Sequence, residues 1–278
     1  MKPVTLPLDI PTVVNFALAE DIGDGDITAE LISATKTIRA NIISRDTGIL
    51  CGKPWAVEIF NQLDNTVNLS WHADDGDTIE NNQTIVTLEG SARSILTAER
   101  TILNFMQTLS ATATLSHSFA SMVKHTKVKL LDTRKTLPGL RTAQKYAVSI
   151  GGCHNHRMGL WDAFLIKENH IAACGGIEPA ISNARALYED RPVEIEVQSL
   201  DELDEAIQSA ADIIMLDNFE IPDIIKAVAA NNHRCKLEAS GGIDDGKLVK
   251  IAETGVDYIS IGALTKNCTA FDLSLLVQ

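Results

Sequence analysis

Residues 193–216, VEIEV-QSLDELDEAIQSAAD-IIML, hold one unit of a repeated pattern that decides the fold. Val193–Val197 and Ile213–Leu216 are short apolar segments with the length of buried strands. The amphipathic stretch between them fits a helix of roughly 10 residues. A strand, a helix and a second strand in this order predict two parallel strands joined by a right-handed crossover.

The same pattern extends outward in both directions along the chain. Six predicted strands belong to it: Val128–Leu131, Ala163–Ile166, Val193–Val197, Ile213–Leu216, Lys236–Ala239 and Tyr258–Ile261. Their even spacing, without a GxGxxG turn, favours a barrel over a doubly wound nucleotide-binding sheet. Because six units are clear where a complete barrel has eight, the fold class is α/β with an open, incomplete barrel.

Residues 1–112 have a different rhythm, that of a mixed α+β domain. Asp9–Glu20 is a predicted helix with Pro11 in its first turn, and Ile38–Ser44 and Val67–Trp71 alternate as strands do. Asp74–Asp77 is a predicted turn before a further extended pair that ends near Gly90.

A helical pattern follows from Ser91 to Met122, interrupted only by the small residues Ser110–Thr114. We place the domain boundary at this interruption. The predicted domains are therefore residues 1–112 and a catalytic barrel of residues 113–270, and residues 271–278 form a tail that could pack on the N-terminal domain.

Composition excludes several classes of function. The chain has 278 residues and a formal charge of −13, which argues against nucleic acid and against an anionic membrane surface. No apolar run approaches the roughly 20 residues that span a bilayer, and the N-terminus lacks the apolar core of a signal peptide. Five scattered cysteines without a CxxC pair fit reduced thiols and a cytoplasmic protein.

One segment reverses the acidic character of the chain. The 39 residues from Val123 to Trp161 contain eight Lys and Arg and one acid, Asp132. Concentrated positive charge beside glycines predicts a pocket for small, highly charged anions.

Active sites of barrels of this kind form at the carboxyl ends of the strands, where polar or glycine-rich segments follow each predicted strand here. The cations Arg134, Lys135, Arg157 and Lys167 could bind carboxylates and phosphates. The turns Ser240-Gly241-Gly242 and Gly262-Ala263 let backbone N–H groups approach a phosphate, although such glycines can also serve only a tight turn.

Two acids, Glu196 and Asp217, end neighbouring strands. They could hold a divalent metal, bind sugar hydroxyls or pair with nearby cations. His154 and His156 form an HxH pair, but no third ligand with zinc-like spacing follows, so His156 fits an anion-contacting residue better.

The combination of segments resembles quinolinate phosphoribosyltransferase over nearly the whole chain. The resemblance rests on these segments: Asp132–Arg141, Asn155–Leu160, Leu165–His170, Met215–Phe219, Glu253–Asp257, Ala98–Arg100 and Trp71–Asp77. It implies an open α/β barrel of six or seven strands with an N-terminal hammerhead-like sandwich domain. It also implies a homodimer or higher oligomer with the active site at the subunit interface.

The implied reaction is quinolinate plus phosphoribosyl pyrophosphate giving nicotinate mononucleotide, pyrophosphate and CO₂, with Mg²⁺, in NAD biosynthesis. The implied catalytic residues are Lys135, Lys167, Glu196 and Asp217, the two acids being near the ribose and metal. The implied substrate-binding residues are Arg100, Thr133, Arg134, Lys135, His156, Arg157, Lys167, Glu196, Asp217, Ser240, Gly241, Gly242, Ile261, Gly262 and Ala263. Of these, Arg100 is expected to reach the neighbouring subunit's site.

One departure from the family pattern is Cys153, which stands after Gly151-Gly152 where a third glycine is frequent. Three other functions stay open. Lys167 could form a Schiff base in an aldolase or decarboxylase. The molybdenum-transport accessory protein shares the fold, and Asp74–Gly90 is similar to the hairpin of lipoyl and biotinyl carriers, although no Lys occupies its tip.

Overall fold

The structure is a computed structural model that describes residues 4–243, 245–267 and 269–278. It divides into two compact units made of separate chain segments. The first comprises residues up to 118 together with 136–152 and 264–278, and the second comprises residues 119–135 and 153–263. The boundary predicted at residue 112 divides the chain only once. In the structure, the two later segments 136–152 and 264–278 also belong to the first unit.

The first unit is built on an antiparallel sheet with the strand order β12-β1-β5-β3, and β2 and β4 pair separately. Its strands are β1 (Thr37–Ser44), β2 (Gly48–Ile49), β3 (Asn68–Trp71), β4 (Thr78–Ile79), β5 (Thr84–Ser91) and β12 (Leu273–Val277). The last residues of the chain thus form β12, which pairs with β1 so that Leu275 lies opposite Ile42.

The helices of this unit are α1 (Ile10–Ile22), η1 (Ala29–Leu31), α2 (Lys53–Leu63), most of α3 (Ala92–Met122), α4 (Arg141–Ile150) and most of α10 (Ala263–Lys266). Trp55 and Phe60 of α2 and Met106 of α3 are buried in one cluster with Ile42 and Leu88 of the sheet. An apolar core of this size is the main source of stability for an α+β unit, and it confirms the predicted fold class of this half.

α3 runs unbroken through Ser110–Thr114, so the predicted interruption is wrong. The small residues there serve close packing instead. Ser110 Oγ accepts from the Cys51 N–H at 2.9 Å, and Thr114 Oγ1 accepts from the Ile49 N–H at 2.9 Å. A larger side chain at these positions would separate the helix from β2 and the segment that follows it.

The second unit contains the predicted parallel sheet, with the strand order β6-β11-β10-β9-β8-β7. The strands are β6 (Lys129–Leu131), β7 (Phe164–Ile166), β8 (Val193–Val197), β9 (Ile213–Asp217), β10 (Lys236–Ser240) and β11 (Tyr258–Ser260). All six predicted strands are confirmed to within one residue at each end. All five residues of β8 are buried, as expected for a parallel strand covered on both faces.

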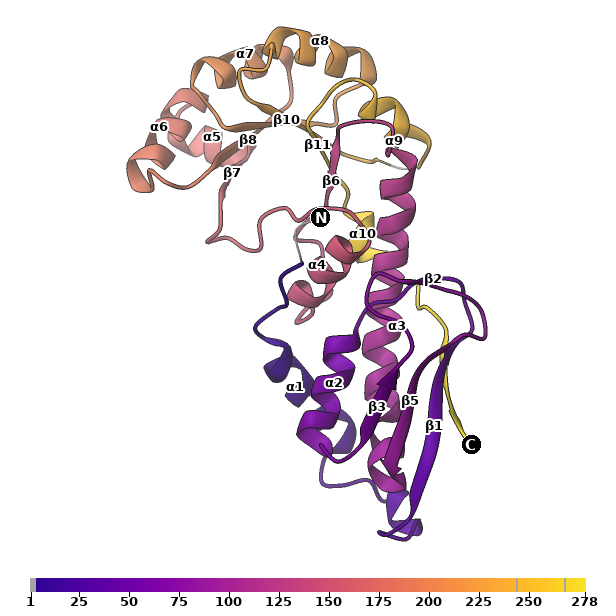
Figure 1. Cartoon of the computed structure of the whole chain (residues 1–278). Coiled ribbons are helices and arrows are strands. Elements are labelled where there is room, and N and C mark those ends of the chain that lie inside the picture. Colours follow the sequence, from indigo (N-terminus) through magenta and orange to yellow (C-terminus); the bar gives the residue numbers. More distant parts are fainter. Residues whose placement is uncertain (1–3, 244, 268) are drawn as a thin grey trace. The chain divides into compact units, whose positions relative to one another are not determined.

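Helices α6, α7 and α8 follow the outer face of this sheet in the upper part of Figure 1. The helices of the unit are α5 (Glu168–Cys174), α6 (Ile177–Leu187), α7 (Leu200–Gln208), α8 (Ile221–Asn231) and α9 (Asp245–Ala252). The barrel is not closed, because β6 pairs with β11 and its Leu131 bridges to His154 rather than to β7. The prediction of an open barrel is confirmed. None of the helices in the described part of the chain has the length and apolar character needed to cross a bilayer.

Candidate active site

The carboxyl ends of β6 and β11 bring a lysine against a glycine turn. After β11, the Ile261 N–H donates to the Leu131 carbonyl at 2.8 Å, and Gly262 follows. A Cβ atom on Gly262 would lie 3.1 Å from Lys135 Cδ and 3.7 Å from Thr133 Oγ1. Thr133 Oγ1 also accepts from the Lys135 N–H at 3.0 Å, which turns the chain as it leaves β6. The absence of a side chain at Gly262 therefore leaves room for Lys135 at the barrel rim.

The ends of β7 and β8 bring the second predicted lysine to an acid. Lys167 Nζ contacts Glu196 Oε2, and the Glu196 side chain is 8% exposed while that of Lys167 is 42% exposed. The pair lies at the rim with the acid inside and the ammonium toward solvent. Such a pair can exchange partners with an anionic or hydroxyl-bearing ligand at modest cost, because the lysine is already half in water.

Asp217 and the predicted phosphate turn after β10 are adjacent. Asp217 lies opposite Ser240 in the sheet register, and the Asn218 side chain donates to Asp217 Oδ2 at 2.8 Å. Gly241 has φ +104°, and a Cβ there would lie 2.1 Å from Asn218 Oδ1. Gly241 is thus required for packing, whereas Gly242, at φ +54°, borders open space and leaves its backbone accessible.

A buried acid fixes the cationic segment that follows β6. Asp132 is fully buried, accepts from the His156 N–H at 2.9 Å and accepts from the Asn155 side chain at 2.7 Å. Charge-assisted bonds of this kind are stronger than neutral ones. Asp132 therefore holds the loop that carries Arg157, a role that the sequence reasoning missed although Asp132 is the one acid of the cationic segment.

Arg157 is held at both its backbone and its side chain. Its N–H donates to His156 Nδ1 at 2.8 Å, and its guanidinium donates to the Ala163 carbonyl at 3.1 Å. Burial lowers the pKa of the guanidinium, and the nearby charge of Arg134 lowers it further, but an arginine stays charged throughout the physiological range. Arg134 and Arg157 are therefore near enough for their charges to repel each other.

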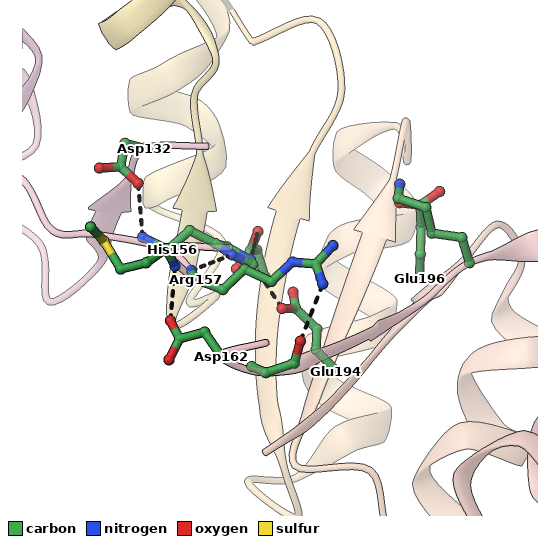
Figure 2. A network of polar contacts seen from close by, with 10 residues as sticks. Asp132, His156, Arg157, Asp162, Glu194 and Glu196 are labelled. Carbon is green, nitrogen blue, oxygen red and sulfur yellow. Dashed lines mark hydrogen bonds and ion pairs between the residues drawn. The ribbon is translucent and has the colours of Figure 1, made fainter. Parts of the chain in front are cut away.

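His156 faces two buried acids that were not predicted as site residues. Its Nε2 lies 3.0 Å from Glu194 Oε2 and 3.6 Å from Glu238 Oε1. Burial, followed by the negative charge of Glu194, raises the pKa of Glu238 above its usual range. Figure 2 shows Asp132, His156, Arg157, Asp162 and Glu194 gathered in one network, with Glu196 to one side of it. The alternation Glu194-Ile195-Glu196 was the available signal, since it sends both acids to the same face of β8.

Both ring nitrogens of His156 are engaged within the chain, because Nδ1 accepts from Arg157. His156 thus supports Arg157 directly. Arg100, by contrast, is exposed on α3 and belongs to the first unit, whereas the other predicted site residues belong to the second.

Glu196 and Asp217 are the residues that could hold Mg²⁺. They lie on neighbouring strands and face the same side of the sheet, because Glu196 pairs with Met215, two residues before Asp217. Mg²⁺ prefers one or two carboxylates together with substrate phosphates and water. The donor set therefore fits the ion.

A cavity of about 950 Å³ lies at the other end of the strands. Lys129, Ile213 and Tyr258, which line it, are the first residues of β6, β9 and β11. Its lining also includes His156 and Arg157, two of the predicted substrate-binding residues, whereas Lys135, Lys167 and the two glycine turns lie at the carboxyl ends of the strands.

Comparisons with known proteins agree with this geometry. The family model for the N-terminal domain of quinolinate phosphoribosyl transferase matches residues 26–110, and that for the C-terminal domain matches residues 112–276. The probable nicotinate-nucleotide pyrophosphorylase (carboxylating) of Bacillus subtilis is 40% identical over 270 residues, which cover 96% of this chain and 93% of that protein.

Two further relatives extend the match. Quinolinate phosphoribosyltransferase (decarboxylating) 1b of Nicotiana tabacum is 38% identical over 300 residues, covering 100% of this chain and 85% of that protein. The solved structure of the nicotinate-nucleotide pyrophosphorylase from Francisella tularensis has a TM-score of 0.96 and 51% identity, covering 99% of this chain and 98% of that one. Matches over both domains, together with the open barrel and its cationic rim, show that the chain belongs to the quinolinate phosphoribosyl transferase family.

Proposed function

We propose that this chain transfers the phosphoribosyl group of phosphoribosyl pyrophosphate to quinolinate, with loss of CO₂, to give nicotinate mononucleotide and pyrophosphate for NAD biosynthesis. The observation that carries the proposal is the convergence of Lys135, Lys167, Glu196 and Asp217 on one rim beside two glycine turns. The substrates are polyanions, so binding requires such a concentration of cations.

The proposed reaction begins with departure of pyrophosphate from the anomeric carbon of the ribose. Lys135, beside Gly262, and Lys167 stabilise the charge that develops on the leaving group. Glu196 and Asp217 bind ribose hydroxyls, and positive charge that forms at the anomeric carbon lies near these two carboxylates. When bound, Mg²⁺ supplies further neutralisation of the pyrophosphate oxygens.

The pyridine nitrogen of quinolinate then forms the bond to the anomeric carbon. Arg134 and Arg157 hold the two carboxylates, Arg157 being fixed in turn by His156 and Asp132. Once the nitrogen is quaternised, the ring accepts the electron pair of the C2–carboxylate bond, and CO₂ leaves without a further cofactor. A proton then takes its place on C2. The contribution of the protein is placement and charge.

The aldolase alternative is less well supported by the surroundings of Lys167. A Schiff-base lysine is activated in an apolar pocket or beside another cation, whereas Lys167 contacts Glu196 and is half exposed.

The assay that tests the proposal combines the purified chain with quinolinate, phosphoribosyl pyrophosphate and Mg²⁺ and follows nicotinate mononucleotide by chromatography. We expect product and CO₂ in equal amounts. Absence of product, or equal activity with nicotinate in place of quinolinate, contradicts the proposal.

We also propose a homodimer in which Arg100 enters the partner's site. Arg100 is exposed on α3, and the same unit exposes the large apolar side chains Leu8, Phe16, Ile27 and Leu31. Such side chains are typical of protein interfaces when they cluster.

We further propose a cytoplasmic location, because Cys51, Cys153, Cys174 and Cys235 are free thiols.

A further inference from the structure

Asn218 connects two neighbouring parts of the candidate active site. It directly follows Asp217, the last residue of β9, and its N–H donates to the Ser240 carbonyl at 2.9 Å. Its side-chain amide donates to Asp217 Oδ2 at 2.8 Å. A Cβ atom on Gly241 would lie 2.1 Å from Asn218 Oδ1 and 2.6 Å from Asn218 Cγ. One residue thus contacts both the acid and the glycine turn that follows β10.

The backbone of Asn218 has a conformation that few side chains favour. Its φ of +56° lies in the left-handed region, which glycine adopts freely and asparagine tolerates better than most residues. Such conformations cluster at functional sites, where the surrounding structure maintains them. A glycine would satisfy the backbone alone, so an asparagine with contacts at both ends of its amide indicates a role for the side chain.

The two ends of the Asn218 amide have different partners for a chemical reason. A carboxylate only accepts hydrogen bonds, so the NH₂ group faces Asp217 and the carbonyl oxygen faces Gly241. The bond to Asp217 is charge-assisted, and bonds of this kind are stronger than those between neutral groups. Because Gly241 has no side chain, the amide lies directly against its backbone. The amide therefore fixes one carboxylate oxygen relative to the turn.

A phosphoribosyl group requires this spacing to be fixed. In the proposed reaction its ribose hydroxyls bind Asp217, and the glycine turn after β10 receives a phosphate. Both groups belong to one small molecule, so they bind together only if the carboxylate and the turn are held at a matching separation. A ligand that has only a phosphate has no such requirement. Freeing the carboxylate should therefore weaken the binding of the complete group and affect phosphate alone much less.

We propose that Asn218 is a positioning residue for phosphoribosyl pyrophosphate, which sets the distance between the Asp217 carboxylate and the turn Ser240-Gly241-Gly242. This role rests on the proposed function, because it presupposes that the rim binds a phosphoribosyl group. Asn218 acts through Asp217 and through the backbone of the turn, without a contact to the reacting atoms.

Asn218→Gly separates the side chain from the backbone conformation. Glycine adopts the left-handed conformation without steric cost, and its N–H can still donate to the Ser240 carbonyl. Asn232→Gly is the matched control, because Asn232 is an exposed asparagine of the same unit with a φ of +44°. Titration calorimetry of the whole protein with ribose 5-phosphate and with inorganic phosphate, both without metal, provides the measurement.

We expect Asn218→Gly to weaken the binding of ribose 5-phosphate at least about 10-fold, the scale of one hydrogen bond to a charged group. The binding of inorganic phosphate should weaken by less than about 3-fold, because the backbone of the turn is unchanged. Asn232→Gly should change neither affinity, and thermal unfolding verifies that both variants fold. Ribose 5-phosphate binding within about 3-fold of that of the wild type, or an equal loss for the two ligands, overturns the role.

Asn218→Asp decides the question if the glycine variant does not fold. It keeps the shape of the side chain but places an acceptor against Asp217, and at about pH 8 both carboxylates are ionised, so the bond is lost. The added charge repels any phosphate, so the quantity to compare is the ratio of the two losses in affinity. Ribose 5-phosphate should lose at least about 10-fold more than inorganic phosphate, and equal losses contradict the role.

Steady-state kinetics separate this role from a general structural one. Asn218→Gly should raise KM for phosphoribosyl pyrophosphate at least about 10-fold and change KM for quinolinate less than about 2-fold, and equal increases contradict the role. If ribose 5-phosphate binding depends on Asn218 but no nicotinate mononucleotide forms, only the choice of reaction is rejected. A wild-type protein that does not bind ribose 5-phosphate overturns the positioning role, whatever the product assay gives.

Discussion

Lys135 gains its importance from position rather than from charge alone. Six other Lys and Arg precede or follow it between Val123 and Lys145, but Lys135 packs against Gly262 at the end of the neighbouring strand. In the proposed reaction, a cation placed there meets a phosphate group bound at the glycine turn. Its neighbours in the sequence that come before β6 have no comparable position.

We expect Lys135→Ala to lower kcat/KM for phosphoribosyl transfer at least about 10²-fold, on the scale of one lost electrostatic contact in a transition state. Lys127→Ala is the matched control, because Lys127 is exposed and precedes β6. Its substitution removes the same charge from the same segment. Steady-state kinetics of both variants provide the measurement. Equal losses in the two variants would show that the net charge matters rather than the site.

Asp132 illustrates a residue whose effect is indirect. It touches the backbone of His156 and the side chain of Asn155, and these place Arg157. Asp132→Asn keeps the shape of the side chain but removes its charge. The new amide NH₂ group then faces one of the two present donors, the Asn155 side chain or the His156 N–H. We expect a loss of about 1–3 kcal/mol in the free energy of unfolding, typical for a buried charged hydrogen bond.

The same variant should raise KM for quinolinate more than it lowers kcat, because Arg157 is displaced rather than removed. Chemical denaturation and initial rates measure the two effects. Unchanged stability with unchanged KM would contradict the anchoring role. Asp46→Asn is a suitable control, since Asp46 is an exposed acid of the first unit that also accepts a backbone N–H, that of Asp272.

At the scale of elements, α4 and α3 meet at a glycine. Gly151 follows α4, and a Cβ atom there would lie 2.3 Å from the Ala113 carbonyl oxygen and 2.5 Å from Ser116 Cβ. The first of these atoms belongs to the α3 backbone, so neither partner can simply rotate away. The glycine therefore sets how closely the end of α4 approaches α3.

Gly151→Ala should reduce the free energy of unfolding by about 1–3 kcal/mol, the usual cost of overpacking. Ser118→Ala, on an exposed position of α3, is the control and should change stability by no more than about 0.5 kcal/mol. Thermal unfolding of both variants tests this. A stable Gly151→Ala protein would show that α4 can shift without cost.

The elements also show how far sequence reasoning reaches. The strands of the barrel could be placed because each is a short apolar run, and Val193–Val197 is buried along its whole length. The break predicted at Ser110–Thr114 failed because small residues read locally as a turn, whereas the partner of Ser110 is Cys51, 59 residues away. Periodicity describes neighbours along the chain and carries no information on such a distant partner.

The sequence also allows some residues of the candidate site to be placed, but not all of them. Lys135 and Lys167 follow strands, and Glu196 and Asp217 lie at the ends of strands, so a parallel sheet brings all four to one rim without further information. Glu238 was overlooked because a single acid within a strand looks like a solvent-facing residue. Only the folded barrel shows that it is enclosed with Glu194 and His156.

At the scale of the whole molecule, the proposed dimer can be tested with two inactive variants. Arg100→Ala and Lys135→Ala should each be strongly impaired as homodimers. If Arg100 acts in the partner's site, a mixed dimer of the two variants has one site with both residues intact. We expect the purified mixed dimer to recover about half of the wild-type activity per dimer.

Differently tagged copies, co-expressed and purified through both tags, provide the mixed dimer. Light scattering after size exclusion verifies its mass. No recovery in a verified dimer would place Arg100 in its own subunit's site, and a monomer with full wild-type activity would exclude the shared site altogether.

The order in which the chain leaves the ribosome gives the pairing of β12 with β1 a further meaning. Residues 153–263 of the second unit are complete before the segment 264–278 of the first has been synthesised. The barrel can therefore fold while β1 still has one open edge, which is a known risk for aberrant strand pairing. The half of the protein that is made first is the last to be finished, and its edge stays open to other chains until the final strand arrives.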